Sequence, residues 1–187
     1  MIVFLDNCAT TPLCNATKKA IIDNIDEYCN PASVYEPSRN MRIKVEEARE
    51  TIAELIGAKS ADEIYFTSGG SESNTWALHD RLSLATNIEH SSIRSDLKFA
   101  IKQDGLVNPE KLNNMLCDFA DVYKEYECPN IVSVQHVNNE IGVIQPIKDC
   151  ATIAHNNGCV FHTDAVQSLP HMKINVQDLG VDMLSES

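Results

Sequence analysis

The sequence predicts an α/β fold with a mainly parallel sheet flanked by helices. Short apolar runs alternate with longer stretches in which apolar residues recur every three or four positions, the order expected of strands and helices in turn. A helix between two strands returns the chain to the same end of the sheet, so consecutive strands run parallel. The 187 residues, 43% of them hydrophobic, can form one domain with a core, and no linker-like stretch divides them. We therefore expect one domain over residues 1–187.

Helices are expected at five places. The clearest carries apolar residues at spacings of three and four and is stopped by a glycine: Met41, Val45, Ala48, Ile52, Leu55 and Gly57. Another begins at Pro109, directly after the N-cap residue Asn108. The remaining helices are expected over residues 15–28, from residue 71 onward and over residues 146–157.

Strands are expected where short apolar runs stand between turn residues. The segment at 63–67 reads as a buried strand that leads into a Gly-Gly turn. Further strands are expected over residues 82–85, 97–101, 131–134 and 159–164, and one more begins at residues 181–184.

Charge and cysteine content disfavour several classes of function. The formal net charge of −12 argues against nucleic-acid binding, which needs a basic face. No apolar run approaches the roughly 20 residues of a membrane helix. The N-terminus turns acidic at Asp6, too early for a signal peptide, so we expect a cytoplasmic protein without membrane association. The seven cysteines form no C-x-x-C pair, which favours free thiols over a zinc site or a disulfide framework.

A glycine turn at 68–70 is a candidate anion site. It joins the expected strand at 63–67 to the helix that opens at Ser71. Glycines let the backbone approach a ligand, the free N–H groups of a helix start point at it, and the Ser71 hydroxyl adds a donor. A plain strand-to-helix turn with Ser71 as N-cap is the commoner meaning of such a turn when it stands alone.

A carboxylate at a strand end is a second candidate. His162 and Asp164 alternate, so their side chains share one face of the strand, and Asp164 lies at its C-terminal end, where open α/β sheets place ligands. Asp164 is suited to pair with a protonated ring nitrogen, and Gln167 to donate to an oxygen on the same ring. The alternative is that Asp164 caps the loop that follows.

Two further polar segments follow apolar runs. Residues 135–142 place Asn138, Asn139 and Gly142 after the strand at 131–134, which is also the composition of an ordinary polar turn. His90 follows the run at 82–85 and is suited to stack on a flat ring or to transfer protons, although a lone histidine is more often structural.

Taken together and in order, these segments resemble the cysteine desulfurases, which are pyridoxal-phosphate (PLP) enzymes of the class V aminotransferase group. The resemblance covers essentially the whole chain, and its motifs are specific only as an ordered set. They lie at residues 5–12 (LDNCATTP), 30–33 (NPAS), 66–74 (FTSGGSESN), 89–90 (EH), 136–142 (HVNNEIG), 162–168 (HTDAVQS) and 182–185 (DMLS). The resemblance implies part of the large domain of a fold-type I PLP-dependent transferase.

The resemblance also implies a role for each matching residue, and no metal site. PLP would be held through its phosphate, its pyridine nitrogen, its ring face and its ring oxygen. The phosphate would be bound by Gly70 and Ser71 with help from Ser187, the nitrogen by Asp164, the ring face by His90, and the ring oxygen by Gln167 and Asn139. His90 is the candidate catalytic residue, as a proton carrier, and Asn139 would also lie beside the substrate carboxylate.

The activity that the resemblance implies is removal of sulfur from L-cysteine. The products are L-alanine and an enzyme persulfide, which is passed on to iron–sulfur cluster assembly or tRNA thiolation. The implied partners are a sulfur-acceptor or scaffold protein and a second copy of the chain or a complementing C-terminal half. Alternatives are a selenocysteine lyase or an aminotransferase of the same class, or a non-catalytic PLP-fold binding module. The sequence VNNEIG at 137–142 favours the desulfurase.

The chain departs from the family pattern in three places. It ends at Ser187, before the lysine that holds PLP covalently, and none of its cysteines matches the catalytic cysteine of a later mobile loop. The region between Asn74 and Gly105 is short, and Glu186 introduces a negative charge near the expected phosphate site. We therefore expect the N-terminal part of a desulfurase-type enzyme, incomplete by itself and prone to self-associate.

Overall fold

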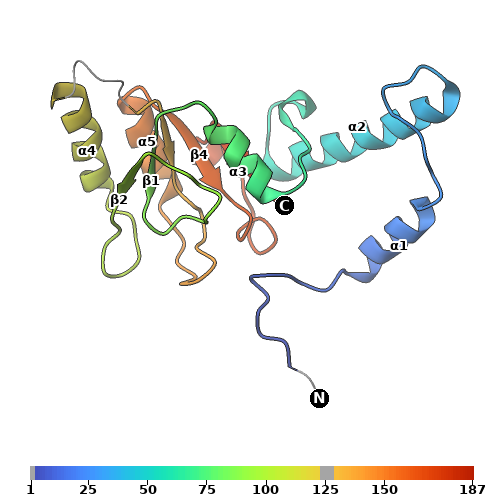
Figure 1. The fold of residues 1–187 in the computed structure, drawn as a ribbon, viewed down its shortest axis with the longest axis horizontal. Helices are drawn as coiled ribbons and strands as arrows, with labels where there is room; N and C mark the ends of the chain where they lie inside the picture. Colours follow the sequence, from blue (N-terminus) through green and yellow to red (C-terminus); the bar gives the residue numbers. More distant parts are fainter. Residues whose placement is uncertain (1–2, 123–128) are drawn as a thin grey trace. The chain divides into compact units, whose positions relative to one another are not determined.

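The computed structural model describes residues 3–122 and 129–187, which fall into two compact units (Figure 1). One unit comprises residues up to Glu54 together with Lys59–Ile64, and the other comprises Leu55–Ala58 together with Tyr65–Ser187. The second unit contains all the strands that the structure describes, and it carries every residue of the candidate site.

The second unit is built on a five-stranded sheet in the order β2-β1-β3-β4-β5. Every neighbouring pair of strands is parallel, which confirms the predicted parallel sheet. The strands are β1 (Ser83–Thr86), β2 (Leu97–Phe99), β3 (Ile131–Ser133), β4 (Val160–Asp164) and β5 (Met183–Ser185).

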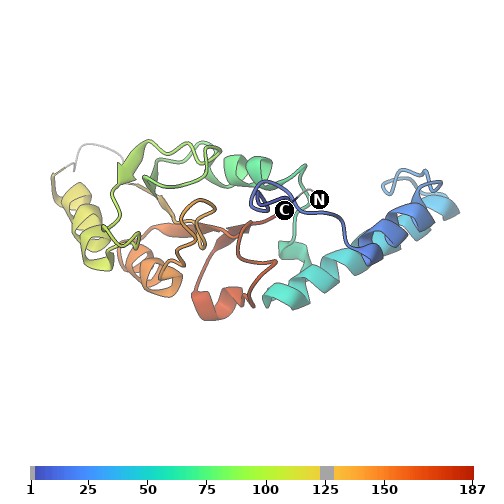
Figure 2. The ribbon, with the colours of Figure 1, turned by 90° about the horizontal axis from the view of Figure 1, so that it is seen from below.

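Helices cover both faces of this sheet, because alternate residues of each strand point to opposite sides. On one face the buried side chains of Leu84, Val132 and Phe161 belong to one apolar cluster with residues of two helices. These helices are α4 (Pro109–Val122) and α5 (Ile147–Asn156). On the other face Ala85 and Ile131 pack against Leu78 of α3 (Gly70–Leu78). In Figure 2 the strands lie between α3 on one side and α4 and α5 on the other.

One short helix was not predicted from the sequence. It is α6 (Val176–Leu179), and the carboxamide oxygen of Asn175 caps it by accepting from the backbone N–H groups of Gln177 and Asp178. Gly180 ends it in a left-handed conformation with φ 70°. A helix of four residues is too short to show an apolar period, which is why the sequence pattern missed it.

The first unit consists mainly of two helices, α1 (Asn15–Asn24) and α2 (Glu36–Ile56). The Lys44 ammonium on α2 donates to the Glu27 carboxylate at 2.7 Å and to the Asn24 carboxamide oxygen at 2.7 Å, which joins α2 to the end of α1. Arg42 donates to the carbonyl oxygens of Pro31 and Ser33 at 2.9 and 2.8 Å, and so holds the motif at 30–33 against α2.

The expected strand at 63–67 was wrong. Residues Ala61–Glu63 form a short 3-10 helix, and no strand follows them before α3. Tyr65 and Phe66 are 67% and 52% exposed, so the apolar run is not buried within the described chain. A run of apolar residues indicates that a segment is suited to burial. It does not determine whether a neighbouring strand pairs with that segment.

The other predicted elements are present with shifted ends. α1 ends at Asn24 instead of near Tyr28, and α2 begins at Glu36, before the first of its regularly spaced apolar residues. No helix in residues 3–122 or 129–187 is long and apolar enough to cross a membrane. No disulfide bond is found among the cysteines that the structure describes, and Cys128 lies outside the described residues.

Candidate functional site

The candidate site lies at the carboxyl ends of β1, β3, β4 and β5, beside the start of α3. Parallel strands bring their carboxyl ends to one edge of the sheet, where open α/β sheets bind ligands. The register sets Asp164 at the end of β4 opposite Ser185 of β5, and His162 opposite Ser133 of β3.

Gly70 and Ser187 lie next to each other at this edge. A Cβ atom on Gly70 would lie 2.6 Å from Cγ2 of Val166 and 3.6 Å from Cβ of Ser187. The first distance is shorter than real Cβ contacts, so a side chain at position 70 would require Val166 to move. Gly70 is the first residue of α3, and Ser71 follows it with an exposed side chain. The predicted anion-binding residues are thus together at a helix start.

Two glutamates flank this helix start. The Glu72 carboxylate accepts from the backbone N–H of Ser68 at 2.5 Å, and that hydrogen bond lowers the pKa of Glu72. Burial raises the pKa of Glu186, which precedes Ser187.

Asp164 is buried and is held by two neutral donors. Its Oδ2 accepts from Nδ2 of Asn74 at 2.7 Å, and its Oδ1 accepts from the backbone N–H of Val166 at 3.1 Å. No ion pair to Asp164 is found among the residues that the structure describes. A buried carboxylate of this kind favours a cationic partner.

His90 is joined to Asp164 through two polar side chains. Its Nδ1 lies 2.7 Å from Oγ of Ser92 and accepts from the backbone N–H of Ser92 at 3.2 Å. The same Ser92 Oγ accepts from Nδ2 of Asn74 at 3.0 Å. Because Nδ1 is an acceptor, the neutral imidazole of His90 carries its proton on Nε2. The residue is exposed.

Glu89 is a functional candidate that the sequence analysis did not single out. Its Oε1 accepts from Oγ1 of Thr86 at 2.5 Å and from the backbone N–H of Gln135 at 2.9 Å. Its Oε2 is buried without a hydrogen-bond partner in the described structure. Burial, helped by the nearby charge of Asp164, raises the pKa of Glu89 to about 8. The only signal in the sequence was its place next to His90.

The neighbouring residues Asn138 and Asn139 have different roles. Asn138 is buried and forms the turn: its Oδ1 accepts from the backbone N–H groups of Glu140 and Ile141, and its Nδ2 donates to the carbonyl of Ile88 at 2.8 Å. Asn139 is half-buried, and its Oδ1 accepts from Nε2 of Gln135 at 3.3 Å. The segment is therefore a polar turn whose second amide lies at the edge of the sheet.

His162 shares a face with Asp164 but lies deeper in the sheet. Its Nδ1 is 2.9 Å from Oγ of Ser133 and its Nε2 is 2.9 Å from Oγ of Ser185. Burial lowers the pKa of His162 to about 3, so the ring is neutral at neutral pH. Gln167 is half-buried in the turn after β4.

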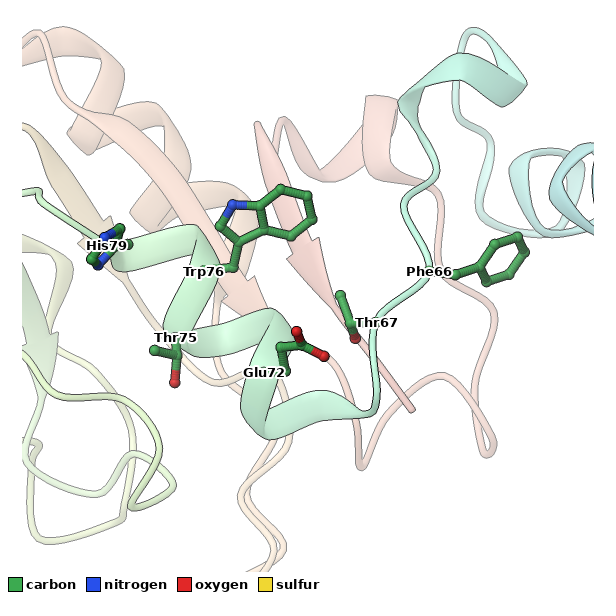
Figure 3. A pocket seen from close by; sticks show the side chains of 6 residues that line it. All are labelled: Phe66, Thr67, Glu72, Thr75, Trp76 and His79. Carbon is green, nitrogen blue, oxygen red and sulfur yellow. The ribbon is translucent and has the colours of Figure 1, made fainter. Parts of the chain in front are cut away.

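A separate shallow pocket lies on another side of α3 (Figure 3). It is lined by Phe66, Thr67, Glu72, Thr75, Trp76 and His79. The rings of Tyr65 and Trp76 meet edge to face with centroids 5.6 Å apart. None of the predicted site residues lines this pocket, so it is not the candidate site.

The structure therefore brings most of the predicted residues to one edge. Gly70 and Ser187 are adjacent, and Asp164 is linked to His90 through Asn74 and Ser92. Asn139 is linked to the His90 loop through Gln135 and Glu89. No cluster of His, Cys, Asp or Glu suited to a metal ion is found in residues 3–122 and 129–187.

Comparison with known proteins identifies relatives of this chain. A cysteine desulfurase IscS of Dictyoglomus turgidum is 37% identical over 206 residues, and the putative cysteine desulfurase NifS of Bacillus subtilis is 35% identical over 197 residues. Each alignment covers 99% of this chain and 50% of the relative, so the chain spans about half the length of these relatives.

Two solved structures share this fold. A NifS-like protein from Rickettsia africae matches with a TM-score of 0.86 at 29% identity, over 99% of this chain and 54% of the other. The protein SspA in complex with cysteine matches with a TM-score of 0.81 at 30% identity, over 96% of this chain and 55% of the other.

Residues 3–187 match the family model described as aminotransferase class-V, a family whose cysteine desulfurases depend on PLP. The match covers nearly the whole chain. This chain is a member of the aminotransferase class-V family, similar to cysteine desulfurases.

Proposed function

We propose that this chain supplies the PLP-binding part of a cysteine desulfurase. The observation that carries the proposal is the buried Asp164 carboxylate, whose donors among the described residues are neutral and which lies at the strand end beside the start of α3. The similarity to cysteine desulfurases supports the reaction, and the complex of SspA with cysteine supports L-cysteine as substrate. The rest of the reaction requires residues that this chain does not contain at the family positions, namely the PLP-binding lysine and the catalytic cysteine.

The residues present fit PLP in two respects. A buried carboxylate without an ion pair suits the cationic nitrogen of a protonated pyridine ring. At the phosphate end, the absence of a side chain at Gly70 lets the start of α3 pack closely against Val166, and Ser187 lies beside it. Backbone N–H groups at the start of α3 and the hydroxyls of Ser71 and Ser187 are the donors that a phosphate needs.

Each remaining residue has a role in this proposal. His90 covers the ring face, and Gln167 and Asn139 donate to the ring oxygen. When bound, PLP supplies an electron sink that withdraws charge from the α-carbon of the substrate. Asp164 keeps the ring nitrogen protonated by its own negative charge. His90, held through Nδ1 by Ser92, carries a proton on Nε2 and is placed to move it at the exposed side of its ring.

The wider assignments rest on the same similarity. We propose that both compact units belong to one large domain, and that the chain acts with a second copy of itself or with a complementing C-terminal half. In this proposal the protein lies in the cytoplasm, and its persulfide passes to a sulfur-acceptor or scaffold protein for iron–sulfur cluster assembly or tRNA thiolation.

The test is PLP binding by the chain itself, measured by calorimetry and by the absorbance of the cofactor. Asp164→Asn keeps the size of the side chain and an acceptor oxygen, and it removes the charge. We expect it to weaken PLP binding about tenfold or more, the usual cost of losing a charge-assisted partner. Asp104→Asn, at an exposed carboxylate in another loop, is the matched control and should bind as the unmodified chain does. Equal affinities of Asp164→Asn and the control would refute the assignment.

A further inference from the structure

Glu89 connects two loops at the carboxyl edge of the sheet. It follows β1 and precedes His90, and its Oε1 accepts from Thr86 on β1 and from the backbone N–H of Gln135 just after β3. One carboxyl oxygen thus bridges the ends of two neighbouring strands.

The Gln135 side chain extends this connection to the asparagine pair. Its Oε1 accepts from Nδ2 of Asn138 at 3.0 Å, and its Nε2 donates to Oδ1 of Asn139 at 3.3 Å. Asn138 also donates to the carbonyl of Ile88, the residue before Glu89. The loop of His90 and the loop of Asn139 are therefore joined at two points, and Glu89 supplies one of them.

The second oxygen of Glu89 indicates the protonation state. Oε2 is buried without a hydrogen-bond partner in the described structure, and an ionised carboxylate there would hold an unsolvated charge close to the charge of Asp164. A neutral O–H in the same position costs far less. Asp164 of β4 is the charged group that acts on Glu89, while Thr86 of β1 and the backbone of Gln135 contribute neutral donors. The raised pKa of Glu89, about 8, agrees with this reasoning.

We propose that Glu89 is a positioning residue of the site, whose protonated carboxyl fixes the His90 loop to the Asn139 loop and leaves the negative charge on Asp164. Two parts of this proposal do not depend on PLP: the bridge that Glu89 makes between the two loops, and the proton on its carboxyl group. Its effect on the cofactor rests on the proposed function, because it concerns the placement of His90 and Asn139 around PLP.

The first experiment measures the proton directly. Infrared spectra of the chain are compared with those of Glu89→Gln, which keeps the size of the side chain and cannot titrate. We expect the unmodified chain to show a carboxylic-acid C=O band at pH 6.5 that is missing in Glu89→Gln and that disappears as the pH is raised through about 8. Glu140→Gln, at an exposed glutamate in the neighbouring loop, should retain the band. A spectrum of Glu89→Gln that equals that of the unmodified chain at pH 6.5 would overturn the proposal.

The second experiment measures positioning. Glu89→Ala removes the bridge, whereas Glu89→Gln preserves an acceptor oxygen and a neutral donor. We expect Glu89→Ala to weaken PLP binding about tenfold and to speed amide hydrogen exchange at 86–92 and 134–139, because both loops lose a shared partner. Glu89→Gln should stay within about threefold of the unmodified chain below pH 8. It should also lack the loss of PLP affinity that the unmodified chain shows above pH 8.

The outcomes separate this inference from the proposed function. If the unmodified chain does not bind PLP, the cofactor assignment fails, and the infrared band and the exchange of the two loops still decide whether Glu89 is a protonated bridge. If Glu89→Ala leaves loop exchange and PLP affinity unchanged, or if Glu89→Gln is as damaging as Glu89→Ala at pH 6.5, Glu89 is not a positioning residue of the kind proposed.

Discussion

Asn74 donates from Nδ2 to the buried Oδ2 of Asp164 at 2.7 Å, across 90 positions of sequence. The same nitrogen lies 3.0 Å from Oγ of Ser92, which holds Nδ1 of His90. One carboxamide of α3 thus orients both the carboxylate proposed for the pyridine nitrogen and the imidazole proposed for the ring face.

Replacing Asn74 should disturb both groups. We expect Asn74→Ala to lower the free energy of unfolding by about 1–3 kcal/mol, because a buried carboxylate loses a donor. It should also weaken PLP binding. Thr75→Ala, an exposed neighbour on the same helix, is the control for helix propensity and should change neither quantity by more than about 0.5 kcal/mol. Chemical denaturation and PLP titration measure the two effects, and equal behaviour of the two variants would contradict the role given to Asn74.

A side chain at position 70 should be poorly tolerated for a local reason. The Cβ of Gly70→Ala would lie 2.6 Å from Cγ2 of Val166, so we expect a loss of about 1–3 kcal/mol in stability and weaker phosphate binding. The double variant Gly70→Ala with Val166→Ala removes the clashing methyl group. The double variant should be nearly as stable as Val166→Ala alone, because the alanine at position 70 no longer meets the methyl group. Additive effects in this cycle would show that contact with Val166 is not the reason for glycine.

The pH dependence of stability should include a contribution from Glu89. Its pKa is about 8 in the folded chain, against 4.5 for the ordinary group, so the unfolded chain releases this proton first as the pH rises. The stabilisation is complete below pH 4.5 and is lost progressively up to about pH 8. The free energy of unfolding should therefore fall by a few kcal/mol at most over this range in the unmodified chain, compared with Glu89→Gln. Parallel curves for the two proteins would contradict the prediction.

His162 should act in the opposite direction. Its folded pKa of about 3 lies below the ordinary 6.5, so the unfolded chain binds a proton first as the pH falls. The stability that it contributes is complete above pH 6.5 and is lost as the pH falls toward 3. His162→Gln should flatten this part of the curve, although it lowers stability at neutral pH by disturbing the bonds to Ser133 and Ser185. Denaturant titrations at pH 4, 5.5 and 7 provide the test. A slope as steep in His162→Gln as in the unmodified chain would show that another group titrates there.

The aromatic surface formed by Tyr65, Phe66 and Trp76 should promote self-association. These side chains are 67%, 52% and 59% exposed, which is unusual for large apolar groups that lie together. We expect the double variant Phe66→Ser with Trp76→Ser to move the chain toward the monomer in gel filtration at a fixed concentration. Tyr28→Ser, at an exposed tyrosine of the other unit, should leave the elution unchanged. If the unmodified chain elutes as a monomer, the prediction that this aromatic surface promotes self-association is wrong.

The sequence predicted the framework of the site better than its internal connections. Alternation of apolar runs and helical periods was enough to expect the parallel sheet and to place Asp164 at a strand end. The same rule failed at 63–67, since apolar character does not specify a pairing partner. Asn74, Ser92 and Glu89 act through partners brought close by strand order and helix packing. Short-range patterns therefore carried no sign that Asn74 would meet Asp164 or that Glu89 would meet Gln135.

Trp76 is the only tryptophan of the chain, and it is on α3, the helix that begins at Gly70. Its indole is exposed beside the pocket of Figure 3, so its emission responds to whatever covers that side of the helix. PLP absorbs light in the range where tryptophan emits, so a cofactor held at the start of the same helix would quench this fluorescence by energy transfer. The chain therefore contains its own optical reporter, with which ligand binding at the edge of the sheet can be followed without a label.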